Sequence, residues 1–335
     1  MLEITLQEER RAPTTFLYAT ETSDSGSWLT GVEPNLVFCC CNPSTSSFCF
    51  VHAEWCYKSQ VSCDNKCKGP DEWKDISPTC GNRSQSPINI VTKRVESIHL
   101  APLSLQGYQH VFQSIITNNG HTVKFNLSGD AVIDGAGFKE PYKAMEVHFH
   151  WGKNGGPGSE HTIDGEQYPM EMHIVHIKKN YSSVEEAVKD PSGLAVFGFL
   201  YEESDREDNK YDSIINALSD VRFPGNKTVL ASVNLNMLIP PHDTLMRYFR
   251  YSGSLTTPDC AESVIWTVFE STIKLSKKQL STFSELWFEN GTAMTDTFRP
   301  VQPRNGRTIF YSRSNIASVS TVLVVSTLII TFLTL

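Results

Sequence analysis

The sequence predicts a single, mainly β domain with peripheral helices. Short runs rich in β-branched and aromatic residues recur along the middle of the chain, and Gly, Pro, Asn and Asp separate them. Helical patterns are few, and we find neither an internal repeat nor a long linker. The 335 residues would allow two domains, but β-rich folds often reach about 250 residues as one unit.

Five runs have the clearest strand pattern, and three segments have a helical pattern. The strand runs cover residues 122–126, 144–151, 170–176, 193–200 and 263–269. The helical segments cover residues 184–189, 211–221 and 276–287, and the last begins with Ser276, a residue type preferred at helix N-termini. We therefore expect a domain dominated by its sheet.

The overall charge excludes one class of partner. Acidic residues outnumber basic ones by 37 to 29, and the formal net charge is −8. A nucleic-acid-binding protein would show a basic face, so we expect no nucleic acid partner. With 40% hydrophobic residues, the chain is also too apolar for a disordered protein.

Residues 322–335 form an uncharged hydrophobic segment near the C-terminus. This stretch is too short to cross about 30 Å of hydrocarbon at about 1.5 Å per residue, although extension back to Ile316 makes it long enough. A short polar stretch with small residues, 311–315, precedes it, which is typical of a glycosylphosphatidylinositol (GPI) anchor signal. We expect attachment at Ser312 or Ser314 and removal of residues 313–335. A tail-anchored helix is the alternative.

The N-terminal segment, residues 1–53, is expected to be removed as a signal peptide region or to be a misassigned start. Residues 1–30 lack an apolar run, and Val51 and Ala53 place small residues at positions −3 and −1 of a signal-peptidase site. The remaining domain, residues 54–312, keeps five of the nine cysteines. In the oxidising secretory pathway these should pair and leave one over. They are Cys56, Cys63, Cys67, Cys80 and Cys260.

Three histidines predict a metal site. His148 and His150 lie two apart in a strand-like run, so both imidazoles point to one face of the sheet. His173 lies on a second such run, after a loop rich in Gly and Asp. If the two strands are neighbours, three ring nitrogens converge, which is typical of a catalytic zinc site with an open fourth position. A chance surface pair is the alternative, but the neighbours of His148 and His150 are apolar, and unpaired polar rings there would be costly.

Two carboxylates accompany these histidines. Glu171 shares a face with His173 and could accept its second N–H, and Glu146 stands in the same relation to His148. Such carboxylates orient a metal-binding imidazole and raise its basicity. The alternative is that both are ordinary surface residues of half-buried strands.

Seven motifs occur in one order along the chain. They are QSPINI at 85–90, NNGH at 118–121, HFHW at 148–151, GSEHT at 158–162, EMHIVH at 171–176, SLTTP at 254–258 and RPVQ at 299–302. With these motifs the sequence resembles the α-carbonic anhydrases over residues 55–310, and most closely their GPI-anchored carbonic anhydrase IV class. The resemblance implies the α-carbonic anhydrase fold, a large central, mostly antiparallel, mixed and twisted β-sheet, with residues 54–312 as its catalytic domain.

The resemblance implies a zinc enzyme that hydrates CO₂ reversibly to bicarbonate and a proton. His148, His150 and His173 would bind Zn²⁺, which lowers the pKa of its water from 15.7 to about 7 and so supplies hydroxide at neutral pH. Thr256 would accept the hydroxide's hydrogen bond and give its own proton to Glu160, which orients the nucleophile.

The resemblance also assigns the residues around the reaction. His121 matches the proton-shuttle histidine, whose ordinary pKa near 6.5 suits transfer near pH 7. Tyr57 matches the tyrosine that orders the intervening waters, and Thr257 matches the threonine that contacts bicarbonate. Four residues match the apolar wall that receives CO₂: Val175, Val196, Leu255 and Trp266.

The resemblance implies the disulfides Cys80–Cys260 and Cys56–Cys67. Cys63 is then unpaired, or it competes with Cys67. One departure concerns Glu146, since this position is usually glutamine in the family. A carboxylate there would make His148 more electron-rich, so we predict retained activity with a pH profile shifted upward.

The resemblance and the C-terminal pattern together place the protein at the extracellular face of the plasma membrane. Sulfonamide-type inhibitors and bicarbonate transporters are then the expected ligand and partner classes. A catalytically silent ectodomain that acts as a binding module is the alternative function. Members of that kind lack ligand histidines, whereas this chain keeps the three histidines, Thr256, Glu160 and His121. Ester hydrolysis is expected only as a side activity.

Overall fold

The structure is a computed structural model, and it describes residues 55–61 and 67–313. The expected signal-peptidase site at Ala53, the cysteine Cys63 and the candidate anchor residue Ser314 lie outside the described residues. Within them, no helix is both long and apolar enough to cross a membrane.

A 13-stranded sheet forms the body of the domain. A separate 3-stranded sheet has the strand order β1-β8-β9. The strands are β1 (Asn89–Ile90), β2 (Glu96–Ile98), β3 (Leu103–Gln106), β4 (Phe112–Asn118), β5 (Val123–Asn126), β6 (Val132–Gly135), β7 (Tyr142–Trp151), β8 (Thr162–Ile163), β9 (Glu166–Gln167), β10 (Met170–Lys178), β11 (Leu194–Ser204), β12 (Lys227–Val233), β13 (Arg247–Gly253), β14 (Val264–Phe269), β15 (Ile273–Ser276) and β16 (Phe310–Arg313).

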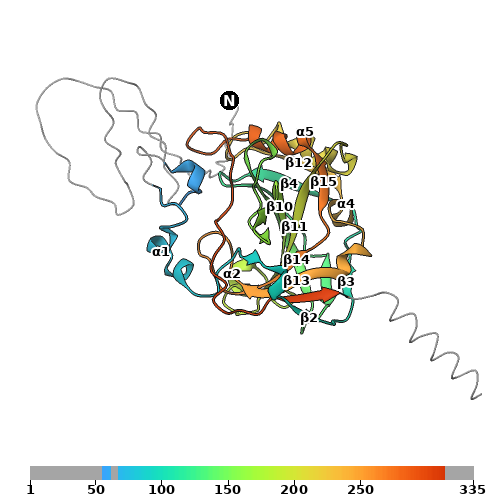
Figure 1. The fold of residues 1–335 in the computed structure, drawn as a ribbon. Helices are drawn as coiled ribbons and strands as arrows, with labels where there is room; N and C mark the ends of the chain where they lie inside the picture. The colour runs from blue at the N-terminus through green and yellow to red at the C-terminus, as the bar shows by residue number, and fades with distance from the viewer. Residues whose placement is uncertain (1–54, 62–66, 314–335) are drawn as a thin grey trace, which may run out of the picture. The chain divides into compact units, whose positions relative to one another are not determined.

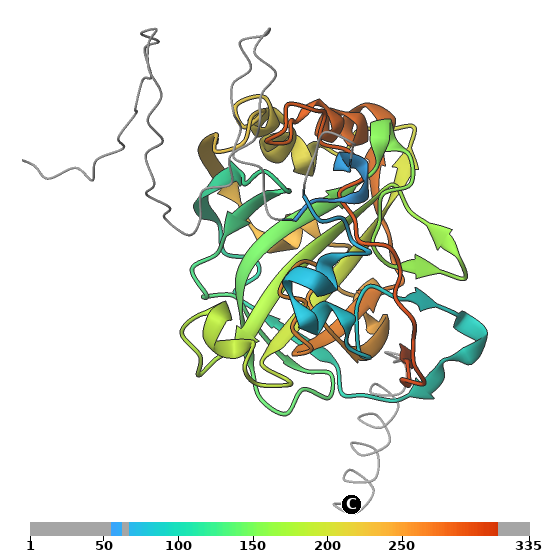
Figure 2. The ribbon, with the colours of Figure 1, turned by 90° about the vertical axis from the view of Figure 1, so that its left-hand side faces the viewer.

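The main path of the large sheet runs β12-β4-β5-β7-β10-β11-β14-β13-β16-β2. Most neighbours are antiparallel, whereas β11–β14, β11–β15 and β16–β2 are parallel. In Figure 2 the long green strands of the sheet centre twist across the molecule. The predicted mainly β fold with a mixed, twisted sheet is therefore confirmed.

Burial along the strands explains which of them lie at the centre. All residues of β10 except Lys178 are buried, because the strand has neighbours on both sides and core on both faces. The edge strand β12 instead mixes exposed and buried residues. Two clusters of buried apolar side chains result, one containing Phe197 and one containing Val196, because successive side chains of a strand point to opposite faces.

The helices are short and surround the sheet, with α5 near the top of Figure 1 and α2 near the bottom. They are α1 (Trp73–Ile76), α2 (Val184–Ala187), α3 (Asp212–Leu218), α4 (Leu235–Leu238) and α5 (Lys277–Thr282). Ser276 caps α5 as predicted, since its hydroxyl accepts a hydrogen bond from the Gln279 N–H. The predicted helix 276–287 is too long: α5 ends at Thr282 and a 3₁₀ turn, Phe283–Glu285, follows.

Candidate metal centre

The register between two neighbouring strands brings the three histidines together. In the antiparallel pair β7–β10, His173 lies opposite His148, and His150 lies opposite Glu171. The ring centroids are 5.1 Å apart for His148 and His150, 5.0 Å for His148 and His173, and 4.7 Å for His150 and His173. One nitrogen of each ring lies within 4.8 Å of the others, so the cluster could hold a metal ion.

The second nitrogen of each ring contacts an oxygen atom. The contacts are His148 Nδ1 to Glu146 Oε1 at 3.1 Å, His150 Nδ1 to the Thr297 carbonyl at 2.6 Å, and His173 Nε2 to Glu171 Oε1 at 2.8 Å. The nitrogens left to face one another are therefore Nε2 of His148, Nε2 of His150 and Nδ1 of His173. His150 Nε2 is buried without a hydrogen-bond partner, and a metal ion would accept its lone pair. This donor set fits Zn²⁺ with an open fourth position.

Burial favours the neutral form that metal binding requires. Desolvation lowers the pKa of His150 well below its ordinary value, and the neighbouring histidines lower it further. Desolvation also lowers the pKa of His173, to about 4, against the opposing effect of Glu171. Both rings therefore carry no proton charge at neutral pH and can offer a lone pair.

Glu171 is a fully buried and fully hydrogen-bonded carboxylate. Burial alone would raise its pKa, but the charges and hydrogen bonds of His161 and His173 lower it well below the ordinary value. Its Oε2 accepts the backbone N–H groups of Glu160 and His161 at 2.9 and 2.8 Å. Gly198 lies opposite His173 on β11, and a Cβ there would come within 2.9 Å of Glu171 Oε1. The missing side chain thus makes room for this carboxylate.

A second group of three possible ligands, His161, Glu171 and His173, is explained by hydrogen bonds. His161 Nδ1 lies 2.7 Å from Glu171 Oε1, and its Nε2 lies 2.7 Å from the Tyr251 hydroxyl. Both ring nitrogens of His161 therefore have partners, and no metal is needed to satisfy them.

Glu160 lies beside the metal centre with one oxygen unpartnered. Its Oε1 accepts the backbone N–H of Arg299 at 2.8 Å. Its Oε2 is buried without a hydrogen bond, 3.5 Å from His150 Nε2 and 4.0 Å from His173 Nδ1. Burial raises the pKa of Glu160, whereas the hydrogen bond from the Arg299 backbone and the nearby Thr256 side chain lower it. The structure thus brings Thr256 and Glu160 together at the site.

The residues expected to receive CO₂ line up across three strands. Val175 lies opposite Val196, and Val196 lies opposite Trp266, so all three share the sheet face of His173. The Trp266 ring lies 4.8 Å from the His173 ring. Leu255 is partly buried against the same cluster, and Thr257 follows Thr256 in the adjoining loop.

His121 does not have the titration behaviour that the sequence suggested. Its ring stacks on Trp55 with centroids 3.8 Å apart, and its Nδ1 is buried without a partner. Desolvation lowers its pKa to about 4, whereas the expectation was a value near 6.5. Tyr57 is also buried, with its ring 6.5 Å from that of His121. The NNGH motif at 118–121 did not reveal the contact of His121 with Trp55, because this contact depends on how the segment before α1 folds back.

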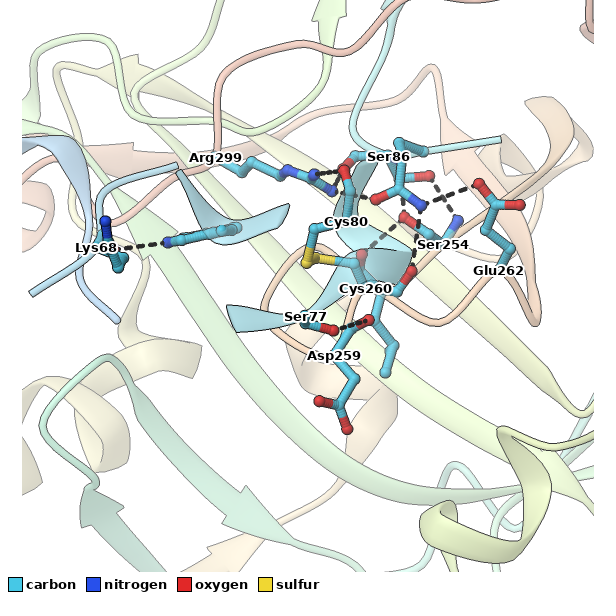
Figure 3. The surroundings of a disulfide bond; sticks show 12 residues. Lys68, Ser77, Cys80, Ser86, Ser254, Asp259, Cys260, Glu262 and Arg299 are labelled. Atoms are coloured by element: carbon cyan, nitrogen blue, oxygen red, sulfur yellow. Dashed lines mark hydrogen bonds between the residues drawn. A yellow bond between two sulfur atoms is a disulfide. The ribbon is translucent and has the colours of Figure 1, made fainter. Parts of the chain in front are cut away.

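The cysteines pair as the resemblance implied. Cys56 bonds Cys67, and Cys80 bonds Cys260. Figure 3 shows the second bridge with Arg299 beside it. The Arg299 guanidinium donates to the Cys80 carbonyl at 3.0 Å and to Gln85 Oε1 at 2.8 Å. Because the Arg299 backbone N–H also donates to Glu160, this network connects the bridge to a carboxylate beside the histidine cluster.

Glu146 has a partner that sequence reasoning missed. Its Oε2 lies 2.7 Å from Lys124 Nζ, while its Oε1 faces His148. Lys124 lies opposite His148 on the adjacent strand β5, so the register creates this three-residue chain. Glu146 and Lys124 thus form an ion pair that offsets the carboxylate charge beside His148, and the shift of the pH profile expected from Glu146 stays a prediction.

Comparison with known proteins identifies the family of this chain. The family model for eukaryotic-type carbonic anhydrases matches residues 68–313. The chain is 39% identical to carbonic anhydrase 4 of Oryctolagus cuniculus over 264 residues, which cover 78% of this chain and 84% of that protein. It is 40% identical to carbonic anhydrase 15 of Mus musculus over 270 residues, 76% of this chain and 82% of that protein. It is 41% identical to carbonic anhydrase 7 of Mus musculus over 250 residues, which cover 72% of this chain and 93% of that protein. The chain therefore belongs to the eukaryotic-type carbonic anhydrase family.

Proposed function

We propose that this carbonic anhydrase hydrates CO₂ through a hydroxide supplied at the cluster of His148, His150 and His173, at the outer surface of the cell. The convergence of three oriented imidazoles beside an unpartnered Glu160 oxygen supports the proposal most strongly. When Zn²⁺ is bound there, it lowers the pKa of a water molecule to about 7 and supplies the nucleophile.

The side chains around the cluster would orient the nucleophile and the substrate. The Thr256 hydroxyl would donate its proton to the unpartnered Oε2 of Glu160, and its lone pairs would then stay available to accept a hydrogen bond from the nucleophile. That acceptance would fix the nucleophile's direction of attack. Val175, Val196, Leu255 and Trp266 offer CO₂ an apolar surface, which suits a molecule without charge. Thr257 would contact bicarbonate as it forms.

His121 would carry the released proton away from the reacting centre. Stacked on Trp55, its ring has a pKa of about 4 and holds a proton poorly at neutral pH. We propose that proton transfer uses a second ring orientation, turned away from Trp55, in which solvent contact restores a pKa near 6.5. Tyr57 would order the water molecules that connect the reacting centre with the His121 ring.

Stopped-flow CO₂ hydration by the full chain tests this function. We expect rapid turnover by the wild type and loss of both turnover and bound zinc in His148→Ala. His99→Ala is the matched control, because His99 is exposed and belongs to no ligand cluster among the described residues. Absence of zinc and turnover in the wild type would instead support the binding-module alternative. Inhibition by an aromatic sulfonamide should accompany activity.

We further propose a GPI anchor at Ser314. Ser312, the other candidate, lies in β16 opposite Tyr248 and is only 1% exposed, so lipid attachment at this residue would require opening the strand. Attachment at Ser314 leaves β16 intact. Bicarbonate transporters are the partner class we expect at that surface.

Release from intact cells by a phosphatidylinositol-specific phospholipase, together with incorporation of labelled ethanolamine, tests the anchor. Ser314→Trp should abolish both, whereas Ser318→Trp, inside the expected tail, should retain them. Failure of the wild type to incorporate ethanolamine would support a transmembrane tail instead.

A further inference from the structure

Five Asn-x-Ser/Thr triplets lie in the described part of the chain and have no part in the metal centre. Their asparagines are Asn82, Asn126, Asn180, Asn226 and Asn290. Such a triplet can accept an N-linked glycan when the chain enters the secretory pathway. The triplet alone does not say which asparagine is used, so we compared their surroundings in the fold.

The triplet that begins at Asn126 presents both of its recognised residues to solvent. Asn126 is the last residue of β5, and it and Ser128 are exposed, whereas Leu127 between them packs against the core. The Asn126 side-chain amide makes no hydrogen bond to another described residue. In contrast, Asn290 is partly buried, and its Oδ1 accepts the backbone N–H and the hydroxyl of Thr292 at 3.1 and 2.7 Å.

An exposed apolar strip, formed by Ile115 and Val229, lies directly beside Asn126. Ile115 on β4 and Val229 on the edge strand β12 lie opposite one another and are 47% and 50% exposed. In Figure 1, β4 and β12 are neighbours near the top of the domain. Ile116 of β4 lies opposite Phe125 of β5, so the next pair in this antiparallel register joins Ile115 to Asn126.

The strip continues the sheet face that carries the metal centre. Asn126 lies opposite Glu146 on β7, and Glu146 lies opposite Val175 on β10. Because residues opposite one another share a face, one row crosses the sheet from the strip to the wall expected to receive CO₂. Its members are Val229, Ile115, Asn126, Glu146 and Val175. Asn126 therefore stands between the strip and the carboxylate that contacts His148.

We propose that Asn126 carries an N-linked glycan and that this glycan covers the strip of Ile115 and Val229. Exposed apolar side chains on an edge strand favour association with other chains, and edges of this kind are usually covered. A glycan is bulky and well solvated, and one attached in the same row can lie over both side chains. The inference rests on the proposed extracellular location, because the modification belongs to the secretory pathway.

The attachment step uses a lipid-linked oligosaccharide diphosphate as the donor. A bond forms between Asn126 Nδ2 and the anomeric carbon of the first sugar, and the bond from that carbon to the diphosphate oxygen breaks. The amide loses one proton, and the lipid diphosphate leaves with the bonding electron pair. No oxidation or reduction takes place.

Peptide mapping of the full chain expressed in cultured animal cells tests the attachment. A peptide N-glycosidase in water labelled with heavy oxygen converts each glycosylated asparagine to labelled aspartate. We expect the label at Asn126, and we expect Ser128→Ala to lose that label and the mass of one glycan. Ser97→Ala, which changes an exposed serine outside every triplet, should keep both.

Hydrophobic-interaction chromatography of the native proteins tests the covering role. Ser128→Ala should be retained longer than the wild type, because the strip is then exposed. Adding Ile115→Thr and Val229→Thr to Ser128→Ala should return the retention time to that of the wild type. Equal retention of Ser128→Ala and the wild type would overturn the covering role.

The five triplets distinguish failure of this proposal from failure of the proposed function. A glycan on another triplet, with Asn126 unmodified, would overturn this proposal alone. If no triplet is modified, the proposal falls together with the extracellular location. CO₂ hydration is measured separately on the same protein, so neither outcome decides the proposed activity.

Discussion

The ion pair between Lys124 and Glu146 should set the pH profile of CO₂ hydration. Glu146 Oε1 contacts His148 Nδ1 at 3.1 Å, and Oε2 contacts Lys124 Nζ at 2.7 Å. With the lysine in place, the carboxylate charge is largely offset, so the pair resembles the neutral amide usual at this position. Removal of either partner leaves one charge uncompensated beside His148, a proposed metal ligand.

The size of the effect follows from the geometry. A lone charge on Glu146 or Lys124 would lie about 8 Å from the water that supplies the nucleophile, across one imidazole ring. At an effective dielectric constant of about 20, it changes the proton affinity of that water by about 2 kcal/mol, or about 1.5 pKa units. The two side chains are 34% and 22% exposed, so solvent screening reduces the effect to about one unit or less.

The four-member mutant cycle separates the two charges. Lys124→Met leaves the negative charge and should raise the kinetic pKa of CO₂ hydration. Glu146→Gln leaves the positive charge and should lower it. The double variant loses both charges and should return close to the wild type, and Lys227→Met, an exposed strand lysine, should change nothing. Stopped-flow pH profiles provide the measurement. Shifts of the same sign in both single variants, or no shift in either, would refute the reasoning.

Three further predictions concern other parts of the site. Replacement of both Cys80 and Cys260 by serine should lower the free energy of unfolding by about 2–5 kcal/mol, measured by urea denaturation; equal stability of the variant would contradict a bracing role. Trp55→Ala should raise the pKa of His121 from about 4 toward 6.5, because the ring gains solvent; an NMR titration of that histidine that stays near 4 would contradict the desolvation argument. The same titration has a stability consequence in the wild type: the unfolded chain binds the extra proton between about pH 6.5 and 4, so the contribution of His121 to stability is present above 6.5 and is lost as pH falls toward 4. Val196→Phe should reduce kcat/KM for CO₂ while zinc content stays unchanged, because the added ring fills the apolar wall beside Trp266; an unchanged kcat/KM would exclude Val196 from the substrate path.

The strand content of the fold and the shared face of His148 and His150 were accessible from sequence because each depends on short-range pattern, whereas the approach of His173 depends on the pairing of β7 with β10. Alternation along a strand puts His148 and His150 on one face, and the same rule puts Val175 on the face of His173. Cysteine pairing was not derivable from the residues alone, and it followed only from resemblance to a family. Helix ends were less accessible: α5 ends at Thr282, although the pattern extends to 287.

Other features depend on contacts between distant segments. Lys124 reaches Glu146 because β5 and β7 pair in one particular register, which local pattern does not specify. Trp55 stacks on His121 although the two residues lie far apart in the chain, and the burial to which this contact contributes lowers the pKa of the ring. Arg250 would pass for an exposed strand residue until the sheet is assembled around it. Charge and solvation at these positions are properties of the assembled fold.

The central claim is that the three-histidine cluster holds the metal on which CO₂ hydration depends. Zinc should be removed from the purified full chain with a chelator and then restored in measured steps, with hydration rate and protein-bound zinc followed together. We predict that activity returns in proportion to bound zinc and reaches its plateau at one ion per chain, and that His173→Gln neither retains zinc at that stoichiometry nor recovers activity. Hydration that persists without zinc, or a His173→Gln variant that binds one ion and works like the wild type, would contradict the account.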